Sequence, residues 1–289
     1  MTGLPLDGFG AVVVGGSRGI GAAVATLLVE LGAGVVINGR DGDAVRATVS
    51  SITAAGGRAI GYPGSASDDA VAEALIALCE NEFGQINALV NCAGTAEPKG
   101  SSILNVSPSE FRDLIDTHLG TVFATCRAAA PKMVARGGGS IVNTSSFAFL
   151  GDYGGTGYPA GKGAVNGLTM AIAAELAGQG VRANVICPGA KTRLSTGTDY
   201  ERHIESLRHR GMLDELSAQG ALDAAPPEYA ASLYAYLISD LSKPVTGQIF
   251  IAAGGFVGRF DRPSPALLGY RDHHDSGPWS ITEIARMLS

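Results

Sequence analysis

The chain has 289 residues, of which 41 are glycine, 46% are hydrophobic and 17% are charged. This composition excludes an intrinsically disordered protein and predicts a globular chain with a large core. The net charge of −6 argues against nucleic acid or an anionic membrane as the main partner. The sequence shows neither a bilayer-spanning apolar run nor a signal-peptide pattern, so we expect a cytoplasmic protein.

The first predicted strand is the continuous apolar run Ala11–Val14, which is typical of a strand buried on both faces of a parallel sheet. A glycine-rich turn, Gly15–Gly21, follows directly and leads into a helical pattern over 22–31. Free backbone N–H groups and the helix dipole favour an anion at such a turn, although its glycines could serve packing alone. We predict phosphate binding here, by Gly15, Ser17, Arg18, Gly19 and Ile20.

The second predicted strand, 35–38, ends at Gly39 and Arg40, where many NAD sites place a carboxylate for the ribose 2′-hydroxyl. Two arginines, Arg18 and Arg40, suit a 2′-phosphate, because a guanidinium binds phosphate through two hydrogen bonds. The sequence therefore favours NADP(H) over NAD(H), with NAD(H) still possible. The alternative interpretation is that Arg40 is solvated at the start of the next helix.

Alternation of strands and helices continues along the chain. Helices are predicted over 41–56, 68–83, 107–136 and 158–178, and strands over 58–62, 88–90, 141–144, 181–186 and 248–252. The start of the third of these helices has a cap, a proline and a glutamate in Ser107-Pro108-Ser109-Glu110. This order predicts a single α/β domain, with a Rossmann-like, doubly wound parallel sheet of about seven strands between two helical layers.

The carboxyl ends of parallel strands meet at one edge of the sheet, where ligands bind. Candidate site residues at these ends are Asn91, Ala93, Gly94, Ser145, Ser146, Pro188, Gly189 and Thr192. Tyr158 and Lys162, four residues apart at the start of a helix, place a phenol and an ammonium on one face. A cation beside a phenol favours the phenolate, although such a pair could also be a surface pair.

These motifs together resemble the short-chain dehydrogenase/reductase family, in its order and spacing, over roughly residues 8–255. The resemblance implies an NAD(P)-dependent enzyme that interconverts a ketone and a secondary alcohol. It implies that Tyr158 is the acid/base and that Lys162 binds the nicotinamide ribose and lowers the pKa of Tyr158. A serine would hold the carbonyl oxygen, and Thr192 would lie near the nicotinamide amide.

Two positions leave alternatives open. Strand register favours Ser146 as the catalytic serine, whereas the family's usual gap before Tyr158 favours Ser145. His118 stands where the family usually has an asparagine that helps to hold a water on the proton path. An imidazole could do the same and add a pH dependence near neutrality, or it could be a core histidine.

The histidine variant resembles the (3R)-hydroxyacyl-CoA dehydrogenase branch, so 3-oxoacyl thioesters of CoA or acyl carrier protein are the leading substrates. The alternatives are a hydroxysteroid or another bulky apolar ketone, or a non-catalytic dinucleotide-binding sensor or scaffold. Residues 193–225 are expected to form a substrate lid with an apolar wall and several cations. The apolar residues are Leu194, Leu207, Met212, Leu213 and Leu216, and the cations are Arg202, His203, Arg208, His209 and Arg210.

The dinucleotide-binding domain is expected to span 1–255, and 256–289 to be an extension that packs on it or on a neighbouring subunit of a homotetramer or homodimer. The extension should end in a short helix over 281–288, with Trp279 as a docking anchor.

No metal site is expected, because His273-His274 has no acidic or cysteine partner. Four scattered cysteines should be buried thiols in a reducing compartment. They are Cys79, Cys92, Cys126 and Cys187.

Overall fold

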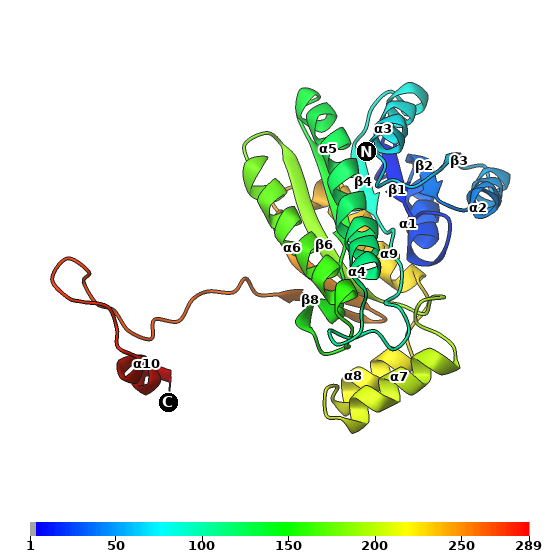
Figure 1. Cartoon of the computed structure of the whole chain (residues 1–289). Coiled ribbons are helices and arrows are strands. Elements are labelled where there is room, and N and C mark those ends of the chain that lie inside the picture. Colours follow the sequence, from blue (N-terminus) through cyan, green and yellow to red (C-terminus); the bar gives the residue numbers. More distant parts are fainter. Residues whose placement is uncertain (1–3, 289) are drawn as a thin grey trace.

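The computed structural model describes residues 4–288, which build one eight-stranded sheet with helices on both faces (Figure 1). The strand order is β3-β2-β1-β4-β5-β6-β7-β8. The strands are β1 (Gly10–Val14), β2 (Gly34–Gly39), β3 (Arg58–Pro63), β4 (Ala88–Asn91), β5 (Gly139–Thr144), β6 (Val181–Gly189), β7 (Ile249–Ala253) and β8 (Phe256–Phe260). The predicted α/β fold with a doubly wound, Rossmann-like sheet is confirmed.

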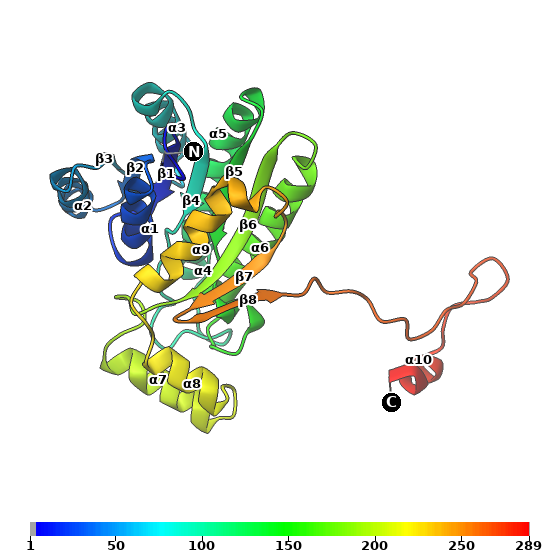
Figure 2. The same cartoon turned by 180° about the vertical axis from the view of Figure 1, so that it is seen from behind.

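Two helical layers cover the sheet. One layer contains α1 and α9 with α2 beside them, and the other contains α3, α5 and α6 (Figure 1, Figure 2). Their bounds are α1 (Gly19–Glu30), α2 (Gly42–Ala54), α3 (Asp69–Phe83), α5 (Thr121–Ala135), α6 (Gly157–Glu175) and α9 (Glu228–Ile238). Among the helices within residues 4–288, none has both the length and the apolar composition that crossing a bilayer requires.

The apolar run of β1 is explained by these two layers. Val13 packs into the core on the α1 side, whereas Val12 and Val14 pack into the core on the α3 side. Side chains alternate between the faces of a strand, so a strand between two helical layers is apolar at every position.

The sheet has one strand more than the seven predicted. Residues 256–260, assigned from the sequence to the C-terminal extension, form β8, which pairs antiparallel with β7. The turn between these strands contains Gly254 with a φ of +56°. A hairpin signal was therefore present in the sequence, but its second strand is short and mostly exposed, so the alternating apolar pattern is weak.

The strand order reverses at β1, which pairs with β2 on one side and with β4 on the other. The carboxyl ends of β1 and β4 therefore face a common crevice. The turns that follow them lie so close that a Cβ on Gly15 would be 2.5 Å from the backbone nitrogen of Ala93. Gly15 also has a φ of +72°, so this crossing requires glycine.

The helix predicted over 107–136 is interrupted near its middle. Its first part, α4 (Pro108–Ile115), begins with the expected capping box between Ser107 and Glu110. Asp116–Gly120 (η1) then forms a π-helical turn before α5. Such turns insert an extra residue into a helix and often occur at functional sites.

Residues 193–225 contain two helices, α7 (Thr198–His209) and α8 (Glu215–Leu222), which lie beside the carboxyl end of the sheet (Figure 1). Leu207 and Leu213, predicted to form an apolar substrate wall, are instead buried in a small core between these helices. Leu194 and Leu216, from the same predicted wall, are exposed, so only part of its apolar side chains pack within the segment.

Residues 261–288 extend away from the domain as an arm that ends in α10 (Ile281–Leu288), the short helix expected from the sequence (Figure 1, Figure 2). The guanidinium of Arg271 lies 3.8 Å from the ring centroid of Trp279 and also binds Glu283 at 2.6 Å. Trp279, the predicted docking anchor, thus packs inside the arm. The arm has an internal structure although no residue of Ile281–Leu288 is buried.

Candidate active site

The glycine turn after β1 is open for an anion. Helix α1 begins at Gly19 without a side-chain cap and without an acidic residue in its first turn. Its first N–H groups are therefore free of carboxylate partners. A Cβ on Gly19, which has a φ of +53°, would approach Thr192 Cγ2 to 3.4 Å. The structure thus brings Thr192, from the segment after β6, beside the predicted phosphate turn.

The end of β2 has little room for a side chain. A Cβ on Gly39 would lie 2.5 Å from Ser17 Oγ, which accounts for a glycine where a carboxylate is common. Arg18 binds Asp41 at 2.5 Å, so one of the two predicted phosphate cations has an acidic partner. Arg40 is exposed and forms no ion pair within residues 4–288.

Tyr158 and Lys162 lie together on the first turns of α6, as their spacing predicted. The Lys162 ammonium is 5.8 Å from the Tyr158 ring centroid and donates to the carbonyl oxygen of Thr144 at 2.9 Å. Lys162 is only 4% exposed, and this burial lowers its pKa to about 8. Burying an ammonium without a carboxylate beside it lowers the stability of the fold, so stability does not explain Lys162 at this position.

The pKa of Tyr158 differs from the expectation. Burial raises the pKa of the phenol, and a hydrogen bond with the Ser146 side chain lowers it by less. The pKa of Tyr158 thus stays above its ordinary value although the Lys162 ammonium lies one turn away. Tyr158 is therefore neutral at physiological pH and can donate a proton.

The two candidate serines have different surroundings. Ser145 is 2% exposed and its hydroxyl donates to the carbonyl oxygen of Lys162 at 3.0 Å, which ties β5 to α6. The Ser146 hydroxyl accepts from the N–H of Ala148 at 3.2 Å and lies close enough to Tyr158 to lower the pKa of its phenol. Ser146 is thus the serine that faces the phenol.

His118 lies in the π-helical turn and is 1% exposed. Its Nε2 is 3.1 Å from the carbonyl oxygen of Thr95, so Nε2 carries the proton and Nδ1 is an acceptor. Nδ1 is buried without a hydrogen-bond partner among the described residues. Such an orphaned acceptor suits a hydroxyl or a water donor, as a nucleotide ribose would supply.

Of the two alternatives left open for His118, titration near neutrality is contradicted by its burial. Burial, assisted by the positive charge of Lys162, lowers the pKa of His118 to about 3. Its imidazole ring stands edge-on to the Tyr158 ring, with the centroids 4.9 Å apart. The close approach of these helices depends on glycine, because a Cβ on Gly161 would lie 3.0 Å from the Cβ of His118.

The other predicted cofactor residues lie at strand ends around this cluster. Asn91 is buried and uses its side chain inside the core, donating to Asn143 Oδ1 and accepting from the Thr125 hydroxyl, both at 2.9 Å. Its amide therefore fixes the end of β4 and does not project into the crevice. Gly94 faces the site, because a Cβ there would lie 3.1 Å from His118 Cε1 and 3.7 Å from Lys162 Nζ.

Pro188 and Gly189 end β6, where they pair with β7. A Cβ on Gly189 would lie 2.8 Å from the Cβ of Ala253, so glycine allows the close pairing at this strand end. These two residues carry the chain from the sheet to the Thr192 turn, as expected.

Two residues near Tyr158 were missed from the sequence. Tyr200 comes from α7, and burial, then the nearby phenols of Tyr153 and Tyr158, raise its pKa to about 12. Glu97 lies in the segment after β4 and binds the start of α6, 61 residues away. A lone tyrosine on an amphipathic helix and a lone glutamate in a loop gave no local signal that could have identified them.

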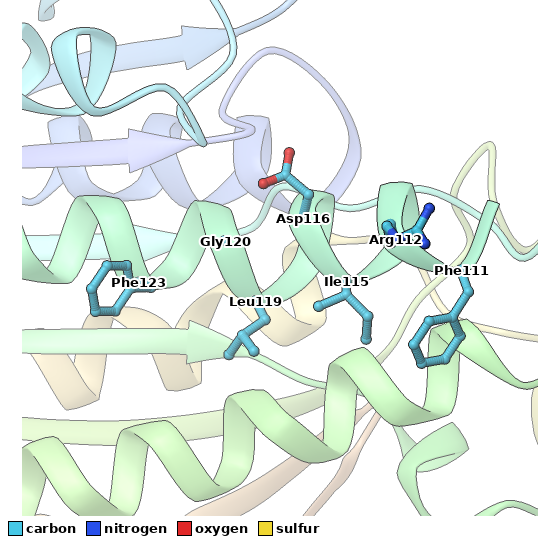
Figure 3. A pocket seen from close by; sticks show the side chains of 7 residues that line it. All are labelled: Phe111, Arg112, Ile115, Asp116, Leu119, Gly120 and Phe123. Carbon is cyan, nitrogen blue, oxygen red and sulfur yellow. The ribbon is translucent and has the colours of Figure 1, made fainter. Parts of the chain in front are cut away.

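One hollow on the surface is separate from the Tyr158 cluster. It has a volume of about 400 Å³ and lies along α4, η1 and α5 (Figure 3). Figure 3 shows the side chains of Phe111, Ile115, Leu119 and Phe123 along it. Phe123 is 51% exposed, so this is an open apolar surface and no catalytic crevice.

The arm contains a group of metal-binding residue types, contrary to the expectation that His273-His274 has no acidic partner. Asp272 is such a partner, and the ligand atoms of the three residues lie within 4.8 Å of one another. All three residues are exposed and consecutive in the sequence. The four cysteines are free thiols, and three of them are buried.

Known proteins resemble this chain over most of its length. A family model described as Enoyl-(Acyl carrier protein) reductase matches residues 14–257. A 3alpha-hydroxysteroid dehydrogenase of Mediterraneibacter gnavus is 35% identical over 247 residues, covering 84% of this chain and 95% of the relative. The 3-oxoacyl-[acyl-carrier-protein] reductase FabG of Chlamydia trachomatis is 31% identical over 250 residues, covering 85% and 96%.

A solved structure extends the likeness to the whole chain. A short chain dehydrogenase from Mycobacterium avium is similar with a TM-score of 0.79 and 31% identity, covering 98% of this chain and 96% of that chain. This coverage includes most of the arm, whereas the two sequence relatives match 84% and 85% of the chain. Taken together, the family model, the sequence identities and the common fold show that the chain belongs to the short-chain dehydrogenase/reductase family, oxidoreductases that act on alcohol and ketone groups.

Proposed function

We propose that the protein is an NADP(H)-dependent enzyme that interconverts an apolar ketone and its secondary alcohol, with Tyr158 as the acid/base. The observation that carries the proposal is the cluster in which Tyr158 lies beside Ser146 and one turn from the buried Lys162. In ketone reduction, Ser146 holds the carbonyl oxygen and the neutral phenol donates its proton to that oxygen. The bound nicotinamide supplies the hydride.

Residues around the crevice fit such a cofactor. The uncapped start of α1 and the turn residues Gly15, Ser17 and Gly19 suit the pyrophosphate. The unpaired Nδ1 of His118 and the Lys162 ammonium both lie near Gly94, where ribose hydroxyls would be held. Ile20, Ala93, Pro188, Gly189 and Thr192 complete the proposed contacts.

The preference for NADP(H) rests on the end of β2. Arg40 is exposed and has no acidic partner within residues 4–288, so its guanidinium is available for a 2′-phosphate. Arg18 can contribute if its ion pair with Asp41 opens, and both side chains of that pair are about half exposed. An exposed ion pair of this kind costs little to break.

A bulky apolar ketone, such as a hydroxysteroid, is the substrate class that the geometry favours. Phe149 and Phe147, just after Ser146, pack edge-on against Phe260 of β8 with centroids 5.2 and 6.2 Å apart. This aromatic group gives the substrate side an apolar wall of the kind that rigid rings require. The 3alpha-hydroxysteroid dehydrogenase among the relatives supports the same class.

A 3-oxoacyl thioester is the second candidate, supported by the FabG relative. The cations of 193–225 would be suited to the phosphate-bearing carrier of such a thioester. Two of them are engaged locally, because Arg202 binds Asp199 and Arg208 binds Glu205, each at 2.7 Å. Because these two cations already have acidic partners, we rank the thioester second, after the apolar ketone.

The test is reduction of a panel of ketones with NADPH: a steroid ketone, a series of 3-oxoacyl-CoA chains and small diketones. We expect turnover of at least one bulky ketone, and loss of about 10²- to 10⁴-fold in kcat for Tyr158→Phe with NADPH affinity retained. A non-catalytic sensor or scaffold would bind NADPH without turnover. An active Tyr158→Phe variant would contradict the acid/base role.

We also propose that residues 193–225 cover the substrate as a lid and that the protein is a cytoplasmic homodimer or homotetramer. The lid is supported by Tyr200 of α7, which lies close enough to Tyr158 for that phenol to raise the pKa of Tyr200. Self-association is supported by the apolar hollow around Phe123 and by the arm, where the exposed fractions of Leu267 and Ile281 are 82% and 88%. Light scattering of the full chain and of a chain ending at residue 262 measures whether the arm contributes to assembly.

A further inference from the structure

The helix that carries Tyr158 has no cap of its own. Thr156, at the N-cap position of α6, makes no side-chain hydrogen bond to the helix, and the first turn contains no acidic residue. The first N–H groups of a helix need acceptors when they are partly buried. The acceptor comes instead from Glu97, in the segment after β4.

Glu97 binds three successive N–H groups at this helix start. One carboxylate oxygen, Oε1, accepts from the N–H of Thr156 and of Gly157, each at 3.2 Å. The other, Oε2, accepts from the N–H of Tyr158 at 2.5 Å. The Ser101 hydroxyl donates to Oε1 at 2.8 Å, so both oxygens are occupied.

The surroundings hold this carboxylate in its ionised form. Partial burial raises the pKa of Glu97, but the hydrogen bonds from Tyr158 and its neighbours outweigh it and keep the pKa below the ordinary value. The chain also wraps closely around the carboxylate, because a Cβ on Gly155 would lie 3.0 Å from Glu97. Gly155 has a φ of +80°, so this wrapping requires glycine.

We propose that Glu97 is a positioning residue that fixes the backbone of Tyr158 and so holds the phenol at Ser146. The catalytic consequence rests on the proposed function. Tyr158 itself is one of the three donors, so the anchor acts on the acid/base directly. Glu97 also follows Gly94 by three residues, which links the segment facing Lys162 to the start of α6.

Replacing Glu97 tests this role in two ways. Glu97→Ala leaves the three N–H groups facing a small cavity, which added formate can fill with a carboxylate. Glu97→Gln keeps the volume but sets an amide donor against one of the N–H groups. The matched control is Asp68→Ala, because Asp68 caps α3 through the N–H groups of Ala70 and Val71, away from the Tyr158 cluster.

For Glu97→Ala we expect kcat on the best ketone of the panel to fall by about 10- to 100-fold, since small displacements of a reacting group have effects of this size. NADPH affinity, measured by fluorescence titration, should be unchanged because Lys162 lies one turn further along α6. Formate should restore much of kcat in Glu97→Ala and none in Glu97→Gln. Asp68→Ala should lower the melting temperature and leave kcat unchanged.

Hydrogen exchange separates this inference from the proposed function. Peptides covering 154–160 should exchange faster in Glu97→Ala than in the wild type, and formate should slow them again. Faster exchange with an unchanged kcat would overturn the positioning role, as would a fall in kcat that formate does not reverse. If the wild type reduces no ketone, the proposed function fails, and unchanged exchange in Glu97→Ala would then overturn the anchor independently.

Discussion

His118 should make the protein less stable in acid by an amount that can be calculated. Burial and Lys162 lower the pKa of the folded imidazole from 6.5 to about 3, so the unfolded chain binds a proton that the folded chain does not. The neutral imidazole therefore contributes fully to the free energy of unfolding above pH 6.5, and this contribution is lost as the pH falls toward 3. Between pH 8 and pH 5 this loss comes to about 2 kcal/mol, from about 1.4 kcal/mol per pH unit.

The measurement is urea unfolding of the wild type and of His118→Asn at pH 8 and pH 5, at one protomer concentration because assembly changes apparent stability. Carboxylates titrate in both proteins, so their effect cancels in the difference. We expect the unfolding free energy of the wild type, relative to the variant, to fall by about 2 kcal/mol at the lower pH. His118→Gln, a second side chain that does not titrate, should give the same result. A difference independent of pH would refute the proposed burial of a neutral imidazole.

Three further predictions concern the cofactor, the serines and the surface. Arg40→Ala should weaken NADPH binding by about 1.5 to 3 kcal/mol, as for a lost charged hydrogen bond, and leave NADH binding unchanged; equal losses in titrations of both cofactors would remove Arg40 from the 2′-phosphate site. Ser146→Ala should lower kcat by about 10²- to 10³-fold. Ser145→Ala should mainly lower the free energy of unfolding, by about 1 kcal/mol in urea unfolding. A large loss of kcat in Ser145→Ala with little loss in Ser146→Ala would assign catalysis to Ser145. Phe123→Glu should reduce the molar mass measured by light scattering, and an unchanged mass would place self-association elsewhere.

The sequence was sufficient wherever a signal lies within one turn or one strand. The apolar run before Gly15 predicted a buried strand, and the spacing of Tyr158 and Lys162 predicted one helical face, because both patterns depend on local geometry. The choice between Ser145 and Ser146 could not be made this way, since neighbouring residues on an extended segment point to opposite sides. Only the contacts with Lys162 and Tyr158 distinguish them.

Properties set by burial or by distant contacts could not be predicted. The sequence left open whether His118 titrates near neutrality or lies in the core, because its pKa depends on how completely α6 and the segment around Thr95 enclose it. Glu97 contacts Tyr158 of α6, which follows it by 61 positions, and no local pattern in the sequence encodes that contact. The strand Phe256–Phe260 was missed because its apolar residues are largely exposed.

The π-helical turn at Asp116–Gly120 also sets a limit on how this chain can vary in length. An inserted residue rotates everything that follows it by about 100° around the helix axis. Leu114 and His118, before and within the turn, both lie against glycines of α6, whereas Met133 is directed to the core beside α3. Loss of one residue here would convert the π-helical turn into regular α-helix. Either His118 would then turn away from the glycines of α6, or the buried side of α5 would turn away from the core beside α3. Insertions and deletions between relatives should therefore avoid this turn and collect in the segments after β4 and β6.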